Sequence, residues 1–346
     1  MPVTVVVGGQ YGGEGKGKVA HFLAQEMNAR VAVRVGGTNS GHTVVDPSGQ
    51  PIILRQLPTP SILPDVICVL GAGSYINPDI LFDEIKRTGL SNDRLFIDPN
   101  AMIISEKDQR EEKGSDLRSS IGSTLSGTGA AVIRRIRRGR TVKLAKDEEC
   151  LRQYIKPAVE FLRDNLLDHE RVIIEGTQGY GLSLLHSPYY PYATSRDTTA
   201  ATFVAEAGIS PLDVDDIALV IRAFPIRVGG NSGPLKHETN WHIISEDSGS
   251  QESLIELTSV SKSVRRIARF DDELVRQAIK VNRPTRIILN HLDYVDFQGR
   301  IKNNVTEKTR EFIRNIEYSL NTPIHYVGLG PSSLMKYIIE EVRVYG

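Results

Sequence analysis

Residues 8–18 constrain this chain of 346 residues more than any other stretch. They read Gly-Gly-Gln-Tyr-Gly-Gly-Glu-Gly-Lys-Gly-Lys, follow the apolar, β-branched run 3–7 and lead into the helix-forming run 19–23. A buried strand, a glycine-rich turn and a helix start, in that order, are typical of a loop that binds phosphate through backbone amides. A glycine-rich turn without a ligand is the alternative, but the density of glycine and lysine favours phosphate.

The same loop matches one known phosphate motif only in part. Gly12, Gly17 and Lys18 fit the spacing G-x-x-x-x-G-K, but Val19 stands where a serine or threonine would bind magnesium. Any metal must therefore be held from elsewhere in the chain.

The rest of the chain alternates strand-like runs with helical patterns, which predicts an α/β fold. We expect a P-loop-type, mostly parallel sheet flanked by helices, with small excursions, as a single domain over residues 1–346. Binding loops of such a sheet lie at the carboxyl ends of its strands. The expected strands are residues 3–7, 30–35, 67–71, 95–98, 102–105, 172–175, 217–224, 286–290 and 324–327, with a helix at 78–87.

Composition narrows the class of protein. Lysine plus arginine and aspartate plus glutamate both number 42, so no net charge favours nucleic acid or a membrane surface as a partner. Cys68 and Cys150 have no metal-ligand spacing and are expected as core thiols in a reducing compartment. No run approaches transmembrane length, and we expect a cytoplasmic protein.

Three further polar clusters are placed like ligand loops at strand ends. Residues 36–43 carry His42 on a glycine-rich loop, where it can act as an acid, although a structural histidine is the alternative. Residues 121–129 combine hydroxyls and glycines ahead of the arginine-rich run 134–140, which suits phosphate, a solvated helix face or nucleic acid. Residues 175–179 and 190–199 form the last cluster, in which Thr198 and Thr199 alternatively cap a helix.

Together these stretches resemble the adenylosuccinate synthetase family over the whole chain, in its compact form. The shared motifs are G-x-Q-[WY]-G-x-E-G-K-G-K, G-G-x-N-x-G-H-T, G-[ST]-T-x-x-G-x-G, E-G-x-Q-G, Y-P-Y-x-T-S and the R-V-G that begins at Arg227. The resemblance implies a homodimeric ligase. With a nucleoside triphosphate such an enzyme phosphorylates the 6-oxygen of a purine monophosphate, and the amine of L-aspartate then displaces the phosphate.

The resemblance also implies roles by position. His42 would be the acid at the 6-oxygen and the γ-phosphate, and the Gly41 carbonyl a Mg²⁺ ligand. The triphosphate would be bound by Gly12, Gly15, Lys16, Gly17, Lys18, Gly41, Arg265, His291, Asp293, Gly328 and Gly330. The monophosphate would be bound by Asn39, Thr124, Gln178, Thr194, Val228, Ser263 and, from the partner subunit, Arg138. Aspartate would be bound by Ser259, Val260, Ser261, Lys262 and Arg265, with Arg266 also suited to a carboxylate.

Two departures from the family pattern bear on the purine. Gly13 replaces the aspartate that removes the N1 proton and binds magnesium, so that role falls to Glu14, to water or to no dedicated residue. Ser263 replaces an arginine that approaches the ribose 2′-hydroxyl, and a site without that reader no longer penalises a 2′-deoxy sugar. We expect Gly13 to open space beside purine N1, where a 2-amino group would project, and Ser263 to release the 2′ position. Both changes favour dGMP, the substrate of the viral branch of the family, the 2-amino-2′-deoxyadenylosuccinate synthases. The missing aspartate also provides an argument against dGMP, because a carboxylate at position 13 could pair with the N1 and 2-amino hydrogens of guanine.

A third departure concerns the phosphoryl donor. His291 replaces the lysine of the guanine-reading K-x-D segment, Asp293 is kept unless it serves a turn, and residues 328–331 replace S-T-G-P. ATP therefore becomes a plausible donor beside GTP or dATP. We expect a dGMP-using ligase that works with Mg²⁺, in host cytoplasm if viral and without nucleic acid or membrane partners. The alternatives are an IMP-using synthetase, a catalytically silent nucleotide-binding regulator and, least favoured, a nucleic-acid-binding module.

Overall fold

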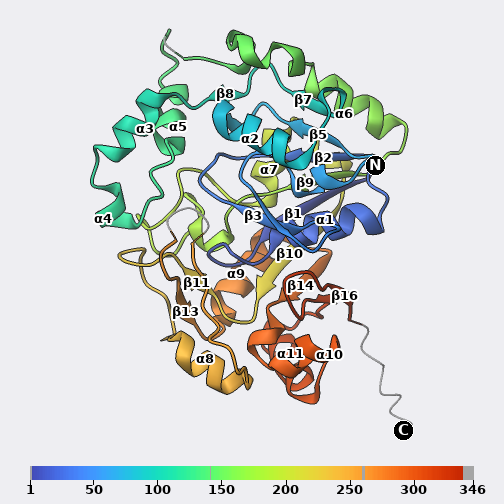
Figure 1. The fold of residues 1–346 in the computed structure, drawn as a ribbon, viewed down its shortest axis with the longest axis vertical. Helices are drawn as coiled ribbons and strands as arrows, with labels where there is room; N and C mark the ends of the chain where they lie inside the picture. The colour runs from blue at the N-terminus through green and yellow to red at the C-terminus, as the bar shows by residue number, and fades with distance from the viewer. Residues whose placement is uncertain (1, 141, 259–261, 338–346) are drawn as a thin grey trace.

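The computed structural model describes residues 2–140, 142–258 and 262–337 and is built on one sheet of nine strands (Figure 1). Their order is β16-β15-β14-β10-β1-β9-β2-β5-β7, and every neighbouring pair is parallel except β15 with β16. The strands are β1 (Val3–Gly8), β2 (Val31–Arg34), β5 (Ile67–Leu70), β7 (Leu95–Ile97), β9 (Val172–Glu175), β10 (Val214–Arg222), β14 (Arg286–Asn290), β15 (Tyr326–Val327) and β16 (Met335–Lys336).

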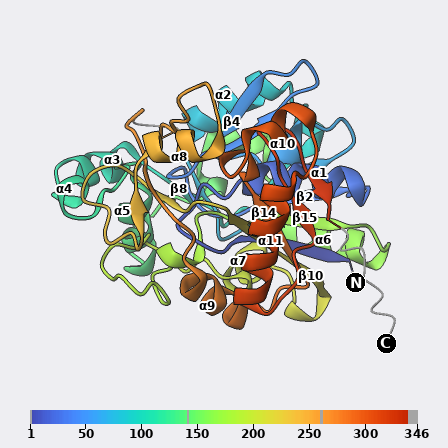
Figure 2. The same ribbon diagram turned by 90° about the horizontal axis from the view of Figure 1, so that it is seen from below.

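The expected α/β architecture is confirmed because the central strands are buried on both faces. In β1, Val5 and Val7 pack into one core cluster and Val6 into another, as alternation along a strand requires. Figure 2 shows the strands between α1 on one side and α7 and α9 on the other. The helices are α1 (Lys16–Glu26), α2 (Pro78–Thr88), α3 (Glu106–Lys113), α4 (Leu117–Ile121), α5 (Thr128–Ile136), α6 (Ala158–Leu167), α7 (Ala200–Ala207), α8 (Trp241–Ser248), α9 (Asp272–Asn282), α10 (Phe297–Lys302) and α11 (Glu307–Leu320).

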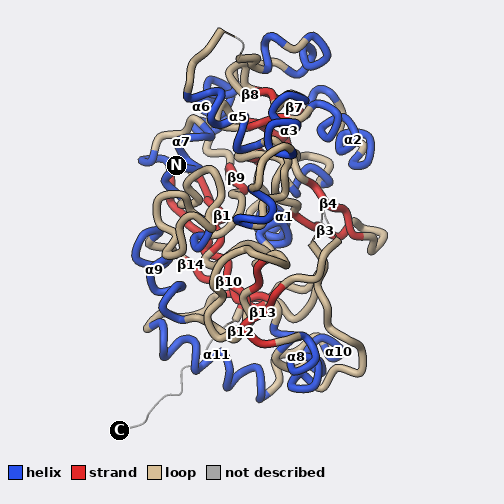
Figure 3. Tube along the Cα trace, turned by 90° about the vertical axis from the view of Figure 1, so that its left-hand side faces the viewer, coloured by secondary structure: helices blue, strands red, loops and turns tan. Residues whose placement is uncertain are grey.

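Two excursions extend from the sheet and flank one edge of it. One carries α3, α4 and α5; the other carries α8 and a three-stranded antiparallel sheet of β11 (Ile226–Arg227), β13 (Arg266–Ala268) and β12 (Glu238–Thr239). Figure 3 shows α3 and α5 near one end of the molecule and α8 near the other. Two small pairs complete the strands, β3 (His42–Val45) with β4 (Pro51–Leu54) and β6 (Tyr75–Ile76) with β8 (Met102–Ile103).

Two expectations about this frame are wrong. The strand expected at 102–105 is the short β8, which pairs with β6 and lies outside the large sheet. Cys68 is a buried core thiol, but Cys150 is exposed because it lies on the outer side of a 3-10 helix, Glu149–Tyr154, of which Leu151 and Tyr154 are the buried residues. Within the described ranges no helix is long and apolar enough to cross a membrane.

Candidate active site

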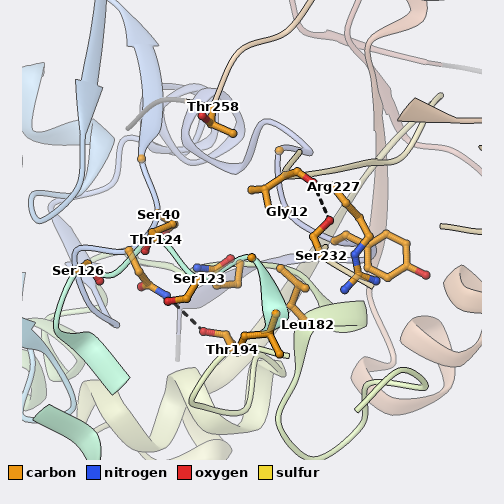
Figure 4. A pocket seen from close by; sticks show the side chains of 18 of the residues that line it. Gly12, Ser40, Ser123, Thr124, Ser126, Leu182, Thr194, Arg227, Ser232 and Thr258 are labelled. Atoms are coloured by element: carbon orange, nitrogen blue, oxygen red, sulfur yellow. Dashed lines mark hydrogen bonds between the residues drawn. The ribbon is translucent and has the colours of Figure 1, made fainter. Parts of the chain in front are cut away.

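A cavity of about 1910 Å³ opens at the carboxyl ends of the central strands and collects all four polar clusters of the sequence. We call its side built from residues 8–18, 36–43, 122–128 and 175–178 the phosphate wall. We call the facing side the ion-pair wall. Its cavity-lining residues are Glu256, Arg265, His291 and Tyr294, and Arg222 lies directly behind them. In Figure 4, Ser40, Thr124, Ser126 and Thr194 lie together on one side of the cavity, away from Gly12 and Arg227.

The glycine-rich loop between β1 and α1 has the conformation of a phosphate cradle. Gly12, Gly13 and Gly15 have φ values of 89°, 71° and 88°, a left-handed region that favours glycine. Gly15 precedes the first turn of α1, so the amides at the start of that helix are left for a ligand. Gly12, Gly13, Gly15, Lys16, Gly17 and Lys18 all line the cavity.

Glu14 lies beneath this loop rather than in the cavity lining. Its side chain is fully buried, and its Oε1 accepts from the amides of Gln10 at 3.2 Å and Gly12 at 2.7 Å. Its Oε2 accepts from Lys16 Nζ at 2.7 Å. Such a carboxylate holds the shape of the loop, and this placement gives it no open path to a substrate proton.

The second lysine links the phosphate loop to the expected donor site. Lys18 Nζ donates to the carbonyls of Gly330 at 2.9 Å and Ser333 at 3.0 Å. Burial lowers its pKa to about 8, against the opposing charge of Asp293. Asp293, Gly328 and Gly330 therefore lie behind Lys18 and outside the cavity lining, whereas His291 and Pro331 line it.

His42 lines the cavity and is held from behind by two charged side chains. Its Nδ1 lies 2.5 Å from Glu175 Oε1 and also contacts Arg34 Nη1, which itself donates to the same carboxylate oxygen at 2.7 Å. Burial and the Arg34 charge lower the pKa of His42 to about 3, so the ring is neutral at physiological pH. Burial raises the pKa of Glu175, but Arg34 and the hydrogen bond with His42 outweigh it and bring it to about 2.

The structure brings most of the expected monophosphate residues together. Asn39 donates to Thr194 Oγ1 at 3.3 Å, which joins two of the clusters across the cavity. Thr124, Gln178, Val228 and Ser263 line the same cavity. Arg138 does not: it is exposed just beyond the end of α5 and is not a lining residue, although Ile136, two residues before it, is.

The expected aspartate loop is described in part. Three residues of the loop fall outside the described residues: Ser259, Val260 and Ser261. Of the rest, Lys262, Ser263 and Arg265 line the cavity, as does Gly41, the expected magnesium ligand. The two arginines differ. Arg266 is committed to Glu238, with its Nε and Nη2 donating at 2.7 and 2.6 Å, while Arg265 Nε lies 4.0 Å from Glu256. Arg265 is thus the better placed of the two for a substrate carboxylate.

Gly13 is enclosed by protein on the side where a side chain would point. A Cβ there would lie 2.6 Å from Ile226 Cδ1 and 3.2 Å from Arg222 Nη1, and its φ of +71° already strains any other residue. The expectation that Gly13 opens space beside the purine is therefore wrong on the side where a side chain would point, because Ile226 and Arg222 fill that space. The Gly13 backbone alone faces the cavity.

The ion-pair wall contains residues to which the sequence gave no role. Arg222, fully buried at the end of β10, pairs with Glu256 and donates to the Gly13 carbonyl at 2.8 Å, and Tyr294 donates to Glu256 at 2.9 Å. Burial opposes ionisation of Glu256, but Arg222 and His291 lower its pKa to about 2. The one signal in the sequence was an arginine inside a run expected to be a buried strand.

The protein groups fit a magnesium ion only as one that arrives with phosphate. Magnesium in nucleotide enzymes keeps several waters and takes substrate phosphates with one or two protein oxygens. Within the described ranges no three His, Cys, Asp or Glu side chains form a metal-binding group. The Gly41 carbonyl at the cavity is the protein oxygen that the resemblance supplies.

Known proteins match this chain over nearly its whole length. A family model described as adenylosuccinate synthetase matches residues 5–148 and 140–306. Adenylosuccinate synthetase of Methanocaldococcus jannaschii is 36% identical over 338 residues, 96% of this chain and 95% of that protein. The enzyme of Pyrococcus horikoshii is 34% identical over 347 residues, 98% of each.

Two solved structures share the fold. One is the succinoaminodeoxyadenylate synthetase of cyanophage S-2L bound to dGMP and dATP, with a TM-score of 0.81 and 29% identity over 97% of this chain and 95% of that one. The other is the fully ligated adenylosuccinate synthetase of Plasmodium falciparum, with a TM-score of 0.81 and 22% identity over 98% of this chain and 100% of that one. These matches show that the chain belongs to the adenylosuccinate synthetase family and is a carbon–nitrogen ligase.

Proposed function

We propose that this ligase joins L-aspartate to C6 of dGMP, giving 2-amino-2′-deoxy-N6-succinyladenylate for the synthesis of 2-aminoadenine DNA. The observation that carries the proposal is Gly13, where the ordinary family pattern has an aspartate. Its left-handed backbone lines the cavity, and Ile226 and Arg222 fill the space a side chain would take. Ser263 at the cavity and the dGMP bound by the cyanophage enzyme support the same substrate.

The chemistry follows from groups at the cavity. The triphosphate lies along the amides at the start of α1, with Lys16 beside it, and its γ-phosphoryl group passes to the 6-oxygen of the purine. The amine of aspartate then attacks C6, and phosphate leaves with the 6-oxygen. His42 stabilises charge on the transferring oxygens by donating a hydrogen bond. The Gly41 carbonyl would hold magnesium, which would supply charge neutralisation to the phosphates.

Aspartate is proposed to lie between the aspartate loop and the purine. Arg265 reads a substrate carboxylate, with Lys262 beside it at the cavity. The N1 proton of the purine leaves to water, because Glu14 is buried under the loop and fully used by three donors. The donor is proposed to be ATP or dATP, since His291 stands in place of the guanine-reading lysine and the cyanophage enzyme binds dATP.

A homodimer completes the site in this proposal. Arg138 is exposed and does not line the cavity of its own chain, while Ile133 and Ile136 of α5 are exposed apolar side chains beside it. Mixing an Arg138→Ala variant with a His42→Gln variant tests this arrangement. Each is expected to be inactive alone, and the mixture to recover activity, because a mixed dimer contains one intact site. No recovery on mixing would contradict the role of Arg138 in trans.

The ordinary reaction with IMP is the second candidate, favoured by identities of 36% and 34% to two archaeal adenylosuccinate synthetases. One experiment separates the two. The protein is incubated with Mg²⁺ and aspartate while GTP, ATP and dATP are crossed with IMP, GMP and dGMP, and products are identified by mass. We expect dGMP plus aspartate less one water. Product from IMP alone would overturn the dGMP assignment, and no aspartate-dependent phosphate release with any pair would leave a silent nucleotide-binding protein.

A further inference from the structure

Two guanidinium groups share one carboxylate at the ion-pair wall. Arg222 ends β10, is fully buried and turns both of its Nη groups to Glu256: Nη2 pairs with Oε1, and Nη1 lies 3.3 Å from Oε2. Arg265 Nε lies 4.0 Å from the same Oε2, beyond hydrogen-bond distance. The negative charge of Glu256 is therefore used mainly by Arg222, and the positive charge of Arg265 is left over.

The backbone, rather than Glu256, holds Arg265 in place. The amide of Arg265 donates to the Glu256 carbonyl at 2.9 Å, and the next pair along, Leu257 and Val264, forms an antiparallel bridge. Arg265 Nε also lies 3.3 Å from the Leu257 carbonyl. Arg265 lines the cavity with 19% of its side chain exposed, whereas Arg222 does not line it. A ligand in the cavity therefore meets the guanidinium of Arg265 and not that of Arg222.

We propose that Arg222 is a positioning residue for the substrate aspartate: it occupies Glu256 and so keeps the Arg265 guanidinium available for a substrate carboxylate. Arg222 acts through these two side chains and does not touch the substrate. The inference rests on the proposed function for the identity of the carboxylate that binds, but not for the pairing among the three side chains.

The other neighbours of Glu256 cannot take the place of Arg222. A carboxylate that is largely removed from water needs a cationic partner. Tyr294 donates to Glu256 at 2.9 Å but carries no charge, and burial holds the pKa of the His291 ring well below its usual value. Of the described side chains around Glu256, Arg265 is then the one permanent cation that remains when Arg222 is lost. Glu256 would pair with it and compete with the substrate.

Arg222 also connects this cluster to the glycine-rich loop. Its Nη1 donates to the Gly13 carbonyl at 2.8 Å. The Gln10 side chain accepts from the amide of Arg222 at 2.9 Å and donates to its carbonyl at 3.1 Å. The residue that keeps Arg265 available is therefore fixed to the loop beside the nucleotides, which sets the distance between them and the aspartate carboxylate.

The test compares Arg222→Met with the double variant Arg222→Met, Glu256→Gln at slightly alkaline pH, where His291 stays neutral. In the single variant the KM for aspartate should rise by about tenfold, because Glu256 competes for the charged hydrogen bond to the substrate. In the double variant no carboxylate competes, and this KM should return to within about threefold of the wild-type value, the size of effect of a neutral substitution. A merely structural role of Arg222 predicts instead that the KM values of all three substrates rise together and that the second substitution restores none of them.

Nitrogen NMR on ¹⁵N-arginine-labelled full-length protein follows Arg265 without turnover, with its Nε signal assigned from an Arg265→Met variant. We expect this signal to shift in Arg222→Met, where Arg265 pairs with Glu256, and to return in the double variant. If Arg222→Met does not fold, Glu256→Gln alone decides. Its KM for aspartate should not rise, because Arg265 stays available, and a tenfold rise would show that Glu256 itself holds Arg265 and would overturn the proposal.

Arg171→Met is the matched control. Arg171 pairs with Asp215 at 2.6 and 3.0 Å and does not line the cavity, so its loss removes a similar ion pair outside the site. It should leave the KM for aspartate and the Arg265 signal unchanged. An unchanged KM for aspartate in folded Arg222→Met, or no recovery in the double variant, overturns the proposal. Failure of the proposed function would appear as a wild-type protein that joins aspartate to no purine monophosphate, and the Arg265 signal would still report whether Arg222 keeps Glu256 from Arg265.

Discussion

The two walls of the cavity are built by different means. Apart from His42 and its lysines, the phosphate wall consists mainly of backbone amides, glycines and hydroxyls, on loops that directly follow β1, β2 and β9 and on the segment between α4 and α5. The ion-pair wall consists of long side chains, such as Arg222 and Glu256, which come from segments 34 residues apart. The first wall suits any phosphate, since amides and dipoles read charge and not the base. The difference teaches that selectivity for the nucleotide must lie mainly on the second wall and at its border with Gly13.

The contrast between the two walls requires that the chemical step take place at the phosphate wall. The His42→Gln variant is the strongest test of that requirement. Glutamine keeps the length of the side chain but cannot replace a ring nitrogen that donates at the same point. We expect kcat to fall by about 1000-fold, within the range for loss of a positioned proton donor. Steady-state assays on the best substrate pair measure this. His242→Gln, an exposed histidine on α8, is the control and should retain full activity. A loss in KM without a loss in kcat would contradict a role in the chemical step.

Two adjacent arginines with different partners, Arg265 and Arg266, test which side chain beside the ion-pair wall binds the substrate aspartate. Arg265→Met should raise the KM for aspartate by about 10- to 100-fold, as expected when a charged hydrogen bond to a carboxylate is lost. Arg266→Met should raise it far less, because Glu238 already occupies that guanidinium. Assays at saturating nucleotide with varied aspartate make the comparison. Equal effects from the two variants would show that Glu238 releases Arg266 when substrate binds.

The phosphate wall was predictable because its chemistry is local. Glycines with positive φ at 12, 13 and 15 lie within a few residues of the strand that precedes them, and the strands 172–175 and 286–290 were predicted with the bounds that β9 and β14 have. A loop at the carboxyl end of a buried parallel strand needs no distant partner to become a site. The α/β class followed from the same alternation of strands and helices.

The ion-pair wall was not predictable because its contacts are not local. Nothing near Arg222 or Tyr294 indicates Glu256, which lies 34 and 38 residues away from them. The sequence also offered Glu14 as a catalytic residue, whereas its pairing with the Gly12 amide and with Lys16 keeps it beneath the loop. The strand expected at 102–105 forms as the short β8, but its pairing with β6 outside the large sheet was not predictable because β6 ends at Ile76, well before β8 begins at Met102.

Asp293, which lies behind Lys18, gives a smaller effect: it makes the free energy of unfolding depend on pH. Burial, opposed by Lys18 and Arg300, raises the pKa of Asp293 from 3.8 to about 6, and its Oδ1 has no hydrogen-bond partner within the described ranges. Between pH 4 and 6 the folded protein then binds more protons at Asp293 than the unfolded chain, so its stabilising contribution is present at low pH and lost as pH rises through 6.

Asp293→Asn tests this because it removes the titration. Relative to the variant, the wild-type protein should lose up to about 2 kcal/mol in free energy of unfolding between pH 4 and pH 7, since one pKa unit corresponds to roughly 1.4 kcal/mol. Urea unfolding at a series of pH values measures the difference. If the free energy of unfolding changes with pH in the same way for both proteins, then a partner in solution already stabilises the Asp293 carboxylate, and its pKa is not raised.

The smallest effect concerns the sugar, and it tests whether selectivity lies at the border of the ion-pair wall. Ser263 is exposed at the cavity, within 3.2 Å of the Thr258 hydroxyl, so an arginine there has room to extend. Ser263→Arg should shift the ratio of kcat/KM toward the ribonucleotide by roughly tenfold, the worth of one hydrogen bond to the 2′-hydroxyl. GMP and dGMP assayed in competition report the ratio directly, and Ser263→Ala controls for loss of the hydroxyl. If Ser263→Arg lowers kcat/KM equally for GMP and dGMP, the arginine obstructs the binding of aspartate. Recognition of the 2′ position would then have to come from the phosphate wall.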